Sequence, residues 1–493
     1  MNFDFLTTIV FLPVLGLLVI ALWPKPAQNT VRIIALVASL ASFFLSLVVF
    51  AGFDRSNASQ IQFEQYLSWI PTINAHYHMG VDGISLPLVV LTTLLGFLSV
   101  LVSWKVSLRS KEYFIWLLLL ESSVIGVFTS LDLLLFFVFW EVELIPMYFL
   151  ISIWGSGRKE YSAIKYVIYT LTGSAMMLAG FLILYFTTGS LDMTEMAGLG
   201  LAKLMVPAGV LFFLLIFAFV VKLPVFPLHT WLPDAHTDAP TAVSVMLAGV
   251  LLKMGGYGII RLCVTILPKV AYEYAQIMVI IAVISIIYGA AVTLRQTDLK
   301  RLIAYSSVSH MGYVLLGIFA FTQISLTGAS LQMFSHGIVT GLLFAMVGLV
   351  YEKAHERNLA KLSGLARRMP VIVVVFTVAG LASLGLPSTS GFIAEFLTFV
   401  GSFSSTVFAG IQAYTIIGII GIVLCAGYIL WMLQRAFYGP PQEKYDHVPD
   451  ADAVEKTCIF IFVAAIMLIG LYPAILTDII KVGVMPIVKM VGL

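Results

Sequence analysis

Residues 211–261 read LFFLLIFAFVVKLPVFPLHTWLPDAHTDAPTAVSVMLAGVLLKMGGYGIIR, and this stretch decides the fold. A first apolar run reaches Lys222 and meets Pro224 and Pro227, and a second apolar run carries Lys253 near its middle. Runs of this length predict helices that cross a membrane. The prolines predict a break in the first helix, because proline removes a backbone donor and clashes with the preceding turn.

The composition of the whole chain is that of an integral membrane protein. Of its 493 residues, 60% are hydrophobic and 11% are charged, whereas soluble domains carry about 25% charged residues. We therefore expect an all-α integral membrane protein with about 14 transmembrane helices, and no gap between them is long enough for a soluble domain. The expected spans are 4–23, 31–53, 83–104, 113–129, 132–153, 162–187, 205–223, 240–264, 270–293, 300–321, 328–353, 371–403, 411–436 and 457–479.

The distribution of basic residues predicts the orientation of the chain. Eighteen of the 27 lysines and arginines lie in loops that follow odd-numbered spans, and six lie on the other side. Cytoplasmic loops carry the excess of positive charge, so both termini are expected on the non-cytoplasmic side. The longest loop, 54–82, contains Tyr66, Trp69 and Tyr77, which suit a membrane interface.

Two of the expected spans carry proline and glycine interruptions, at 222–227 and 385–391. They are the seventh and twelfth spans, so a five-helix repeat would place its second copy upside down. Paired broken helices are typical of inverted-repeat transporters with an ion site at mid-depth. The expected organisation is three N-terminal helices, two inverted five-helix repeats and one C-terminal helix, over 1–104, 113–264, 270–436 and 457–493.

Glu141 lies near the middle of the expected span 132–153, and Lys222 lies directly before the first break. Charged side chains at bilayer depth are costly and usually mark a wet or polar path. We expect Lys222 to pair with Glu141 and to hold or release a proton as the pair moves. Glu143, two residues on, is expected on another face, where a hydrogen bond to a neighbouring helix is the simpler interpretation.

Four further ionisable residues lie inside expected helices: Lys253, His310, His336 and Glu395. Glycines at 255, 256 and 258 permit close helix approach beside Lys253. Histidine titrates near neutrality and suits a proton relay. Haem ligation by the two histidines and plain hydrogen bonds between helices are the alternatives. Hydroxyl groups that would line a water chain in this relay belong to Tyr305, Ser306, Ser307, Ser309, Ser335 and Thr340.

A second polar group lies beside the first break, at His229, Asp234, His236 and Asp238. It predicts either a capped, solvated turn or an entrance for cytoplasmic protons, and its spacing resembles a metal set only superficially. Lys165 lies near the start of its span, where an interfacial position is the simpler interpretation. The three cysteines form no CxxC pair, so no iron–sulfur or zinc site is expected.

Long motifs of this sequence resemble a known family. They are FWEVELIPMYFLI at 139–151, VKLPVFPLHTWLPDAH at 221–236, APTA at 239–242 with LLK at 251–253, and KRLIAYSSVSHMGY at 300–313. They are similar to the antiporter-like membrane subunits of respiratory complex I. Within these they resemble the M-type subunit, which is called subunit 4 in mitochondria and has a D-type counterpart in cyanobacteria and chloroplasts. The resemblance runs from about residue 80 to the thirteenth span.

The resemblance implies fourteen helices with two inverted repeats and proton translocation coupled to quinone reduction elsewhere in the complex. It implies a proton path through Glu141, Lys222, Lys253, His310, His336 and Glu395. It also implies that the electron donor (NAD(P)H or ferredoxin), FMN, iron–sulfur clusters and quinone belong to other subunits, with no cofactor in this chain.

The implied partners are other membrane subunits, including sister antiporter-like subunits, and the lipid bilayer, but no nucleic acid. The implied location is a bacterial inner membrane or a thylakoid. Two other functions stay open: a subunit of a multi-subunit cation/proton antiporter, which would use the same residues without a redox partner, and a structural or assembly protein with no path of its own.

Overall fold

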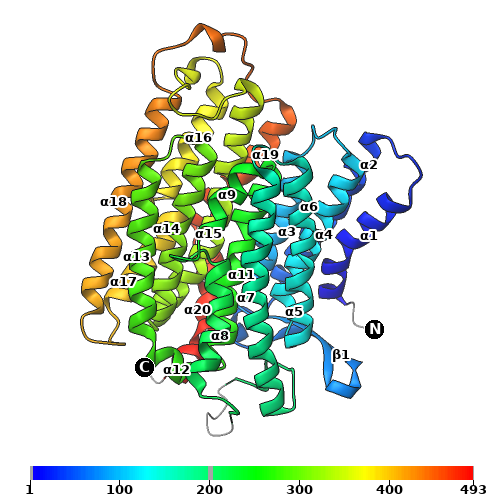
Figure 1. Cartoon of the computed structure of the whole chain (residues 1–493), viewed down its shortest axis with the longest axis vertical. Helices are drawn as coiled ribbons and strands as arrows, with labels where there is room; N and C mark the ends of the chain where they lie inside the picture. Colours follow the sequence, from blue (N-terminus) through cyan, green and yellow to red (C-terminus); the bar gives the residue numbers. More distant parts are fainter. Residues whose placement is uncertain (1–3, 198–203, 492–493) are drawn as a thin grey trace.

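The computed structural model describes residues 4–197 and 204–491, so the outermost residues of the expected terminal segments lie outside the described ranges. Helices packed side by side make up nearly all of the molecule (Figure 1), which confirms the expected membrane-protein fold. Twelve helices of the described residues are long and apolar enough to cross a membrane. These spans are Phe5–Leu22 (α1), Gln28–Gly52 (α2), Ser85–Val102 (α3), Ser110–Thr129 (α4), Leu133–Trp154 (α5 and α6), Lys159–Thr188 (α7), Thr241–Val264 (α10 to η5), Ala275–Leu294 (α13), Leu299–Phe319 (α14), Gln323–Ala354 (α15), Ile411–Ala436 (α18) and Ala453–Leu471 (α19).

Both expected interruptions are present and divide helices into shorter pieces. α8 (Ala208–Lys222) ends at the lysine and α9 (Trp231–Asp238) resumes after a turn. α16 (Pro370–Ser383) and α17 (Ser390–Phe403) are separated in the same way. A break exposes backbone groups that need partners, and the Trp231 indole donates to the Val221 carbonyl at 2.9 Å. The count of fourteen crossings and the inverted repeat both stay predictions.

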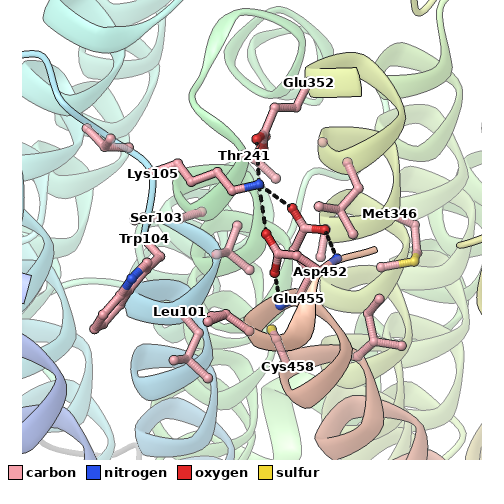
Figure 2. A pocket seen from close by; sticks show the side chains of 18 of the residues that line it. Leu101, Ser103, Trp104, Lys105, Thr241, Met346, Glu352, Asp452, Glu455 and Cys458 are labelled. Atoms are coloured by element: carbon pink, nitrogen blue, oxygen red, sulfur yellow. Dashed lines mark hydrogen bonds and ion pairs between the residues drawn. The ribbon is translucent and has the colours of Figure 1, made fainter. Parts of the chain in front are cut away.

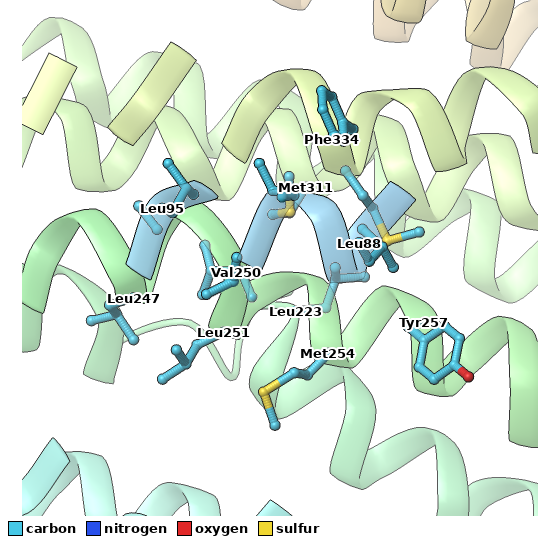
Figure 3. Packing of buried hydrophobic residues seen from close by; sticks show 14 of the residues in the cluster. Leu88, Leu95, Leu223, Leu247, Val250, Leu251, Met254, Tyr257, Met311 and Phe334 are labelled. Atoms are coloured by element: carbon cyan, nitrogen blue, oxygen red, sulfur yellow. The ribbon is translucent and has the colours of Figure 1, made fainter. Parts of the chain in front are cut away.

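The span that carries Lys253 is buried from residue 242 to residue 260 and is not a uniform α-helix. It runs through α10 (Thr241–Met246), η4 (Leu247–Leu251), α11 (Leu252–Gly258) and η5 (Ile259–Val264), and both η segments are π-helical. π-helical turns inside α-helices occur frequently at functional sites. Apolar side chains surround this span on several sides, including those of Leu88, Leu223, Met311 and Phe334 (Figure 3).

The expected loop 54–82 is ordered into a hairpin, which is the one departure from an all-α description among the described residues. β1 (Gln62–Ile70) pairs antiparallel with β2 (Ala75–Val81) and projects beside the helices (Figure 1). The imidazole of His78, in β2, is 2.8 Å from Asp192 and 2.8 Å from Glu64. Burial opposes the charge of this ring, but the two carboxylates outweigh burial and raise the pKa of His78.

The prediction of one C-terminal helix over 457–479 is wrong at its end. α19 stops at Leu471, and a separate helix, α20 (Ala474–Val491), follows. The residue before a proline is biased away from the helical region, which explains the break at Tyr472 and Pro473. α20 packs closely on the start of α3, because a Cβ on Gly483 would lie 2.9 Å from the Gly83 Cα.

The remaining short elements connect the helices and carry no site residue. They are η1 (Arg55–Asn57), η2 (Pro71–Ile73), α12 (Pro268–Glu273), η6 (Leu365–Arg367) and η7 (Glu443–Tyr445).

Candidate functional site

Lys222 lies at the last residue of α8 and is almost fully buried. Its ammonium forms an ion pair with Glu143 and donates to the Tyr166 hydroxyl at 3.0 Å. Tyr166 in turn donates to the Glu143 carboxylate at 2.8 Å, which closes a three-residue network. The ammonium also lies 5.4 Å from the centre of the Trp140 ring, a favourable cation–π distance.

The expected pairing of Lys222 with Glu141 is wrong: the partner is Glu143. Glu141 and Glu143 lie two residues apart where α5 (Leu133–Val142) meets α6 (Leu144–Trp154), so their side chains point about 200° apart and only one of them faces Lys222. Glu143 is fully buried, whereas Glu141 is half-buried. The buried oxygen Oε1 of Glu141 has no hydrogen-bond partner among the described residues.

Lys253 and His336 are in direct contact across α11 and α15. The Lys253 ammonium nitrogen is 2.8 Å from Nδ1 of His336 and also donates to the Ala248 carbonyl in η4. Lys253 is completely buried, and no described carboxylate lies within ion-pair distance of it. The contact between the two nitrogens is within hydrogen-bond distance, so the two side chains can share one proton.

His310 and Glu395 form the next contact. Nδ1 of His310, in α14, is 3.3 Å from the Glu395 carboxylate, in α17. The His310 and His336 rings lie 5.6 Å apart between centroids. Glu395 lies directly over the second break, since a Cβ on Gly385 would come within 2.9 Å of its Oε2. The four residues Lys253, His336, His310 and Glu395 therefore form one continuous row of ionisable groups.

Lys222 and Lys253 are not in direct contact, although their helices touch. A Cβ on Gly255 would lie 2.6 Å from the Phe219 carbonyl and the Leu223 amide. A Cβ on Gly258 would overlap the Phe219 ring. The expectation that these glycines permit close helix approach is confirmed. A proton that passes between the two lysines must cross this tightly packed contact.

The serines expected to hold a water chain are mostly occupied by the backbone. Ser306 and Ser307 both donate to the Ile303 carbonyl, and Ser309 donates to the Ile286 carbonyl. Thr340 donates to the His336 carbonyl. Ser335 differs, because its hydroxyl donates to Ser390 at the first residue of α17. These hydroxyl protons are therefore directed at protein groups.

The polar group beside the first break divides into a paired half and a buried half. Asp234 pairs with Lys165 at 2.7 Å, which gives Lys165 a definite partner. Asp238 accepts from Ser162 at 2.6 Å and is buried. His236 is also fully buried, and its ring stacks on Phe344 with 4.5 Å between centroids.

Two further buried charges, Lys300 and Glu121, are not conspicuous in the sequence. Lys300 donates to the Ala239 carbonyl at 2.6 Å, and the charges of Lys300 and Lys253 both act on the His236 ring. Glu121, in α4, lies against Gly96 of α3, and its Oε1 has no hydrogen-bond partner among the described residues. The single glutamate in the apolar stretch LLLLESS at 117–123 was the available signal for Glu121. Lys300 and Arg301 are adjacent basic residues at the edge of an expected loop, so nothing in the sequence indicated that Lys300 is buried.

The geometry gives no support to a metal or haem site. Within residues 4–197 and 204–491, no three His, Cys, Asp or Glu side chains are arranged to hold a metal ion. Nδ1 of His336 faces Lys253, and Nδ1 of His310 faces Glu395. Three cysteines, Cys263, Cys425 and Cys458, are buried and unpaired.

The fold and the row of buried ionisable groups define a multi-pass membrane protein built to handle charge inside its helical bundle. Residues 130–421 match the family model described as NADH:quinone oxidoreductase/Mrp antiporter, transmembrane. The chain belongs to this family.

Curated relatives cover nearly the whole chain. NAD(P)H-quinone oxidoreductase chain 4 of Synechococcus elongatus is 42% identical over 97% of this chain and 90% of its own length. NADH-quinone oxidoreductase subunit M of Rhodobacter capsulatus is 41% identical over 99% of this chain and 96% of its own length.

Solved structures share the fold. A chain of respiratory complex I from Thermus thermophilus superimposes with a TM-score of 0.87 at 26% identity, over 99% of this chain and 100% of that one. A chain of the Mrp complex from Dietzia matches with a TM-score of 0.85 at 21% identity over 99% of both chains, which shows the fold alone.

Proposed function

We propose that this chain is a proton-translocating membrane-arm subunit of an NAD(P)H-quinone or ferredoxin-quinone oxidoreductase. The observation that carries the proposal is the row Lys253, His336, His310 and Glu395, in which each ionisable group faces the next. The curated relatives named as chain 4 or subunit M support the assignment to this class of enzyme complex. The chain contributes protein groups to the reaction, and the redox groups belong to other subunits.

The proton enters the row from the Lys222 network. When Glu143 and Lys222 are close, the ion pair holds the ammonium form. Separation of the pair leaves the lysine buried without its carboxylate, so the proton passes toward Lys253. Each tenfold change in proton affinity requires about 1.4 kcal/mol, which rearrangement of one poorly screened ion pair supplies. From Lys253 the proton moves through His336 and His310 to Glu395, and it leaves on the non-cytoplasmic side.

The polar group at α9 provides the entrance from the cytoplasm. Lys165 and Asp234 lie at its partly exposed edge, and Lys300 and His236 lie deeper, toward Lys253. A buried histidine is suited to accept a proton on one ring nitrogen and release it from the other. This arrangement gives Lys253 a second supply of protons that does not pass Lys222.

Glu141 connects this subunit to its neighbour. A half-buried carboxylate in the middle of a spanning helix is costly when it faces lipid. It is stabilised when another membrane subunit covers the exposed part of this side chain. Sister antiporter-like subunits are the partners that fit this face, and their charge would act on the Glu143–Lys222 pair from outside.

The test uses the intact complex in sealed vesicles, with Lys222→Ala and Lys253→Ala as single variants. We expect each to lower the number of protons pumped per NAD(P)H or ferredoxin oxidised. Lys361→Ala, on an exposed loop, is the matched control and should pump normally. Normal stoichiometry in both buried-lysine variants, with the complex fully assembled, would sink the proposal.

A second candidate is a subunit of a cation/proton antiporter, which the shared fold with the Mrp chain favours. The two functions differ in their energy source. An antiporter subunit would drive proton movement when Na⁺ or K⁺ gradients are imposed on vesicles without any electron donor. The proposed function predicts no such movement, and protons move only while quinone is reduced.

A further inference from the structure

A cavity of about 700 Å³ lies between the ends of α3, α15 and α19 and the first turn of α10, away from the row of ionisable groups (Figure 2). Its walls are mainly apolar and include Leu101, Met346, Ile459 and Phe462. The volume falls within the range of about 300 to 1,000 Å³ that is typical of ligand sites. Apolar cavities stay dry and take up apolar ligands, so the occupant has a hydrocarbon part.

The depth of the cavity matches one leaflet of a bilayer. Its lining follows α19 from Ala453 to Phe462, which is about 13 Å at a rise of 1.5 Å per residue. Half of a hydrocarbon core of about 30 Å is about 15 Å. Trp104 and Tyr351 lie at the same end as the charged groups, where aromatic residues mark the headgroup level. The cavity therefore fits one acyl chain.

The charged groups at one end of the cavity determine which lipid headgroup can bind there. Figure 2 shows the Lys105 ammonium reaching across the cavity toward Glu352, Asp452 and Glu455, at 3.0, 3.0 and 2.6 Å. Burial opposes the charge of this lysine, but the three carboxylates outweigh burial and raise the pKa of Lys105. Lys353 adds a second ammonium on Glu455 at 3.0 Å.

These five groups carry three negative and two positive charges. An anionic headgroup would add to the excess of negative charge. A headgroup with a primary ammonium and a phosphate is complementary, because the ammonium donates to Asp452 and Glu352 while the phosphate accepts from Lys105. Charge-assisted hydrogen bonds of this kind are stronger than neutral ones.

We propose that this cavity is a binding site for a zwitterionic membrane lipid with a primary ammonium headgroup, of the phosphatidylethanolamine type. One acyl chain fills the apolar part between α3 and α19, and the headgroup lies among Lys105, Glu352 and Asp452. The bound lipid packs against Thr241, in the first turn of the span that carries Lys253. The site is independent of proton transfer, and its occupancy is measured without pumping.

The first experiment fills the cavity in the intact complex. Cys458 is buried and lines the cavity, so Cys458→Phe places a ring where the acyl chain lies. Thr457→Phe, at an exposed position on the same helix, is the matched control. After reconstitution in nanodiscs with deuterated phosphatidylethanolamine and detergent washing, mass spectrometry counts the lipid retained. We expect one lipid fewer per complex in Cys458→Phe and no change in Thr457→Phe.

The second experiment keeps the cavity and changes its charge with Glu352→Gln and Asp452→Asn together. Asparagine caps a helix as well as aspartate does, so the Asp452 cap on α19 is retained. Asp446→Asn, at an exposed site, is the control. In the unaltered complex, competition should favour phosphatidylethanolamine over phosphatidylcholine and phosphatidylglycerol by about tenfold, the value of one charge-assisted hydrogen bond. The double variant should lose this preference.

Three results would overturn the proposal. They are equal retention of all three lipids by the unaltered complex, unchanged retention in both cavity variants, and a side chain of a neighbouring subunit occupying the cavity in a map of the assembled complex. None of these results depends on whether protons are pumped, so failure of the lipid site and failure of the proton path are distinguishable.

Discussion

Two glutamates separated by one residue have different surroundings in this protein. Glu143 is enclosed with Lys222 and Tyr166, while Glu141 lies half-exposed on the bundle surface. Side chains two residues apart on a helix point about 200° apart, so only one of the two carboxylates faces Lys222. The difference assigns the two carboxylates to separate tasks.

The division predicts different results for the two conservative substitutions. Glu143→Gln leaves Lys222 as an uncompensated buried charge, and breaking a buried pair in this way costs about 3–5 kcal/mol. Glu141→Gln removes no ion pair within the chain. We therefore expect less assembled complex and a lower thermal unfolding temperature with Glu143→Gln, and near-normal values with Glu141→Gln, as measured by native gel electrophoresis and calorimetry. The opposite ranking would identify Glu141 as the partner of Lys222.

At the scale of the helices, the close contact between α8 and α11 holds the two buried lysines in register. Gly255 is the point of closest approach, since any Cβ there meets backbone atoms of α8 rather than a flexible side chain. The backbone cannot move aside without moving the whole helix. The distance between the two lysines therefore depends on this one position.

Gly255→Ala should force the helices apart. Overpacking of this kind typically costs about 1–3 kcal/mol. We expect a lower unfolding temperature and slower pumping at an unchanged rate of uncoupled quinone reduction. Gly427→Ala, in α18, is the control, because its nearest neighbour would be the Leu294 side chain at an ordinary 3.7 Å. Equal behaviour of the two variants would show that the contact is not essential.

Sequence patterns predicted the helices and both breaks because hydropathy and proline act locally. The same patterns failed where the outcome depends on packing. The pairing of Lys222 depends on which of two nearby glutamates faces α8 in space, and the hairpin at 62–81 is fixed in part by distant Asp192. Lys300 escapes prediction because its burial depends on α9 and α14 meeting in space. Residue identities indicated the site, while contacts between helices determined which residues pair.

At the scale of the whole molecule, the two ends of the bundle differ in charge and in shape. The hairpin lies at the end where α1 begins (Figure 1), and the loops rich in lysine and arginine lie at the other. The positive-inside tendency predicts that those loops face the cytoplasm. In that orientation the hairpin, and with it His78, lies on the side to which we propose that protons are released.

Cysteine labelling in intact cells measures this orientation. The three native cysteines are buried, so the background is low. Ser68→Cys, at an exposed position of the hairpin, should react with a membrane-impermeant maleimide added from outside the cytoplasmic compartment. Glu443→Cys, exposed in the opposite loop, should react only after the membrane is opened. Labelling in the reverse order would invert the orientation and the direction of the proposed proton path.

The row of ionisable groups crosses the helices sideways, from α11 through α15 and α14 to α17, and Lys253 and His310 lie near the middle of their helices. A charge that moves along this row stays at nearly constant depth. It therefore does almost no work against the membrane voltage, which is about 2.3 kcal/mol per charge for each 100 mV crossed. The voltage acts on the steps into and out of the row. Replacing a residue within the row should change how fast protons move, while replacing one at the entrance or the exit should change how strongly the voltage slows them.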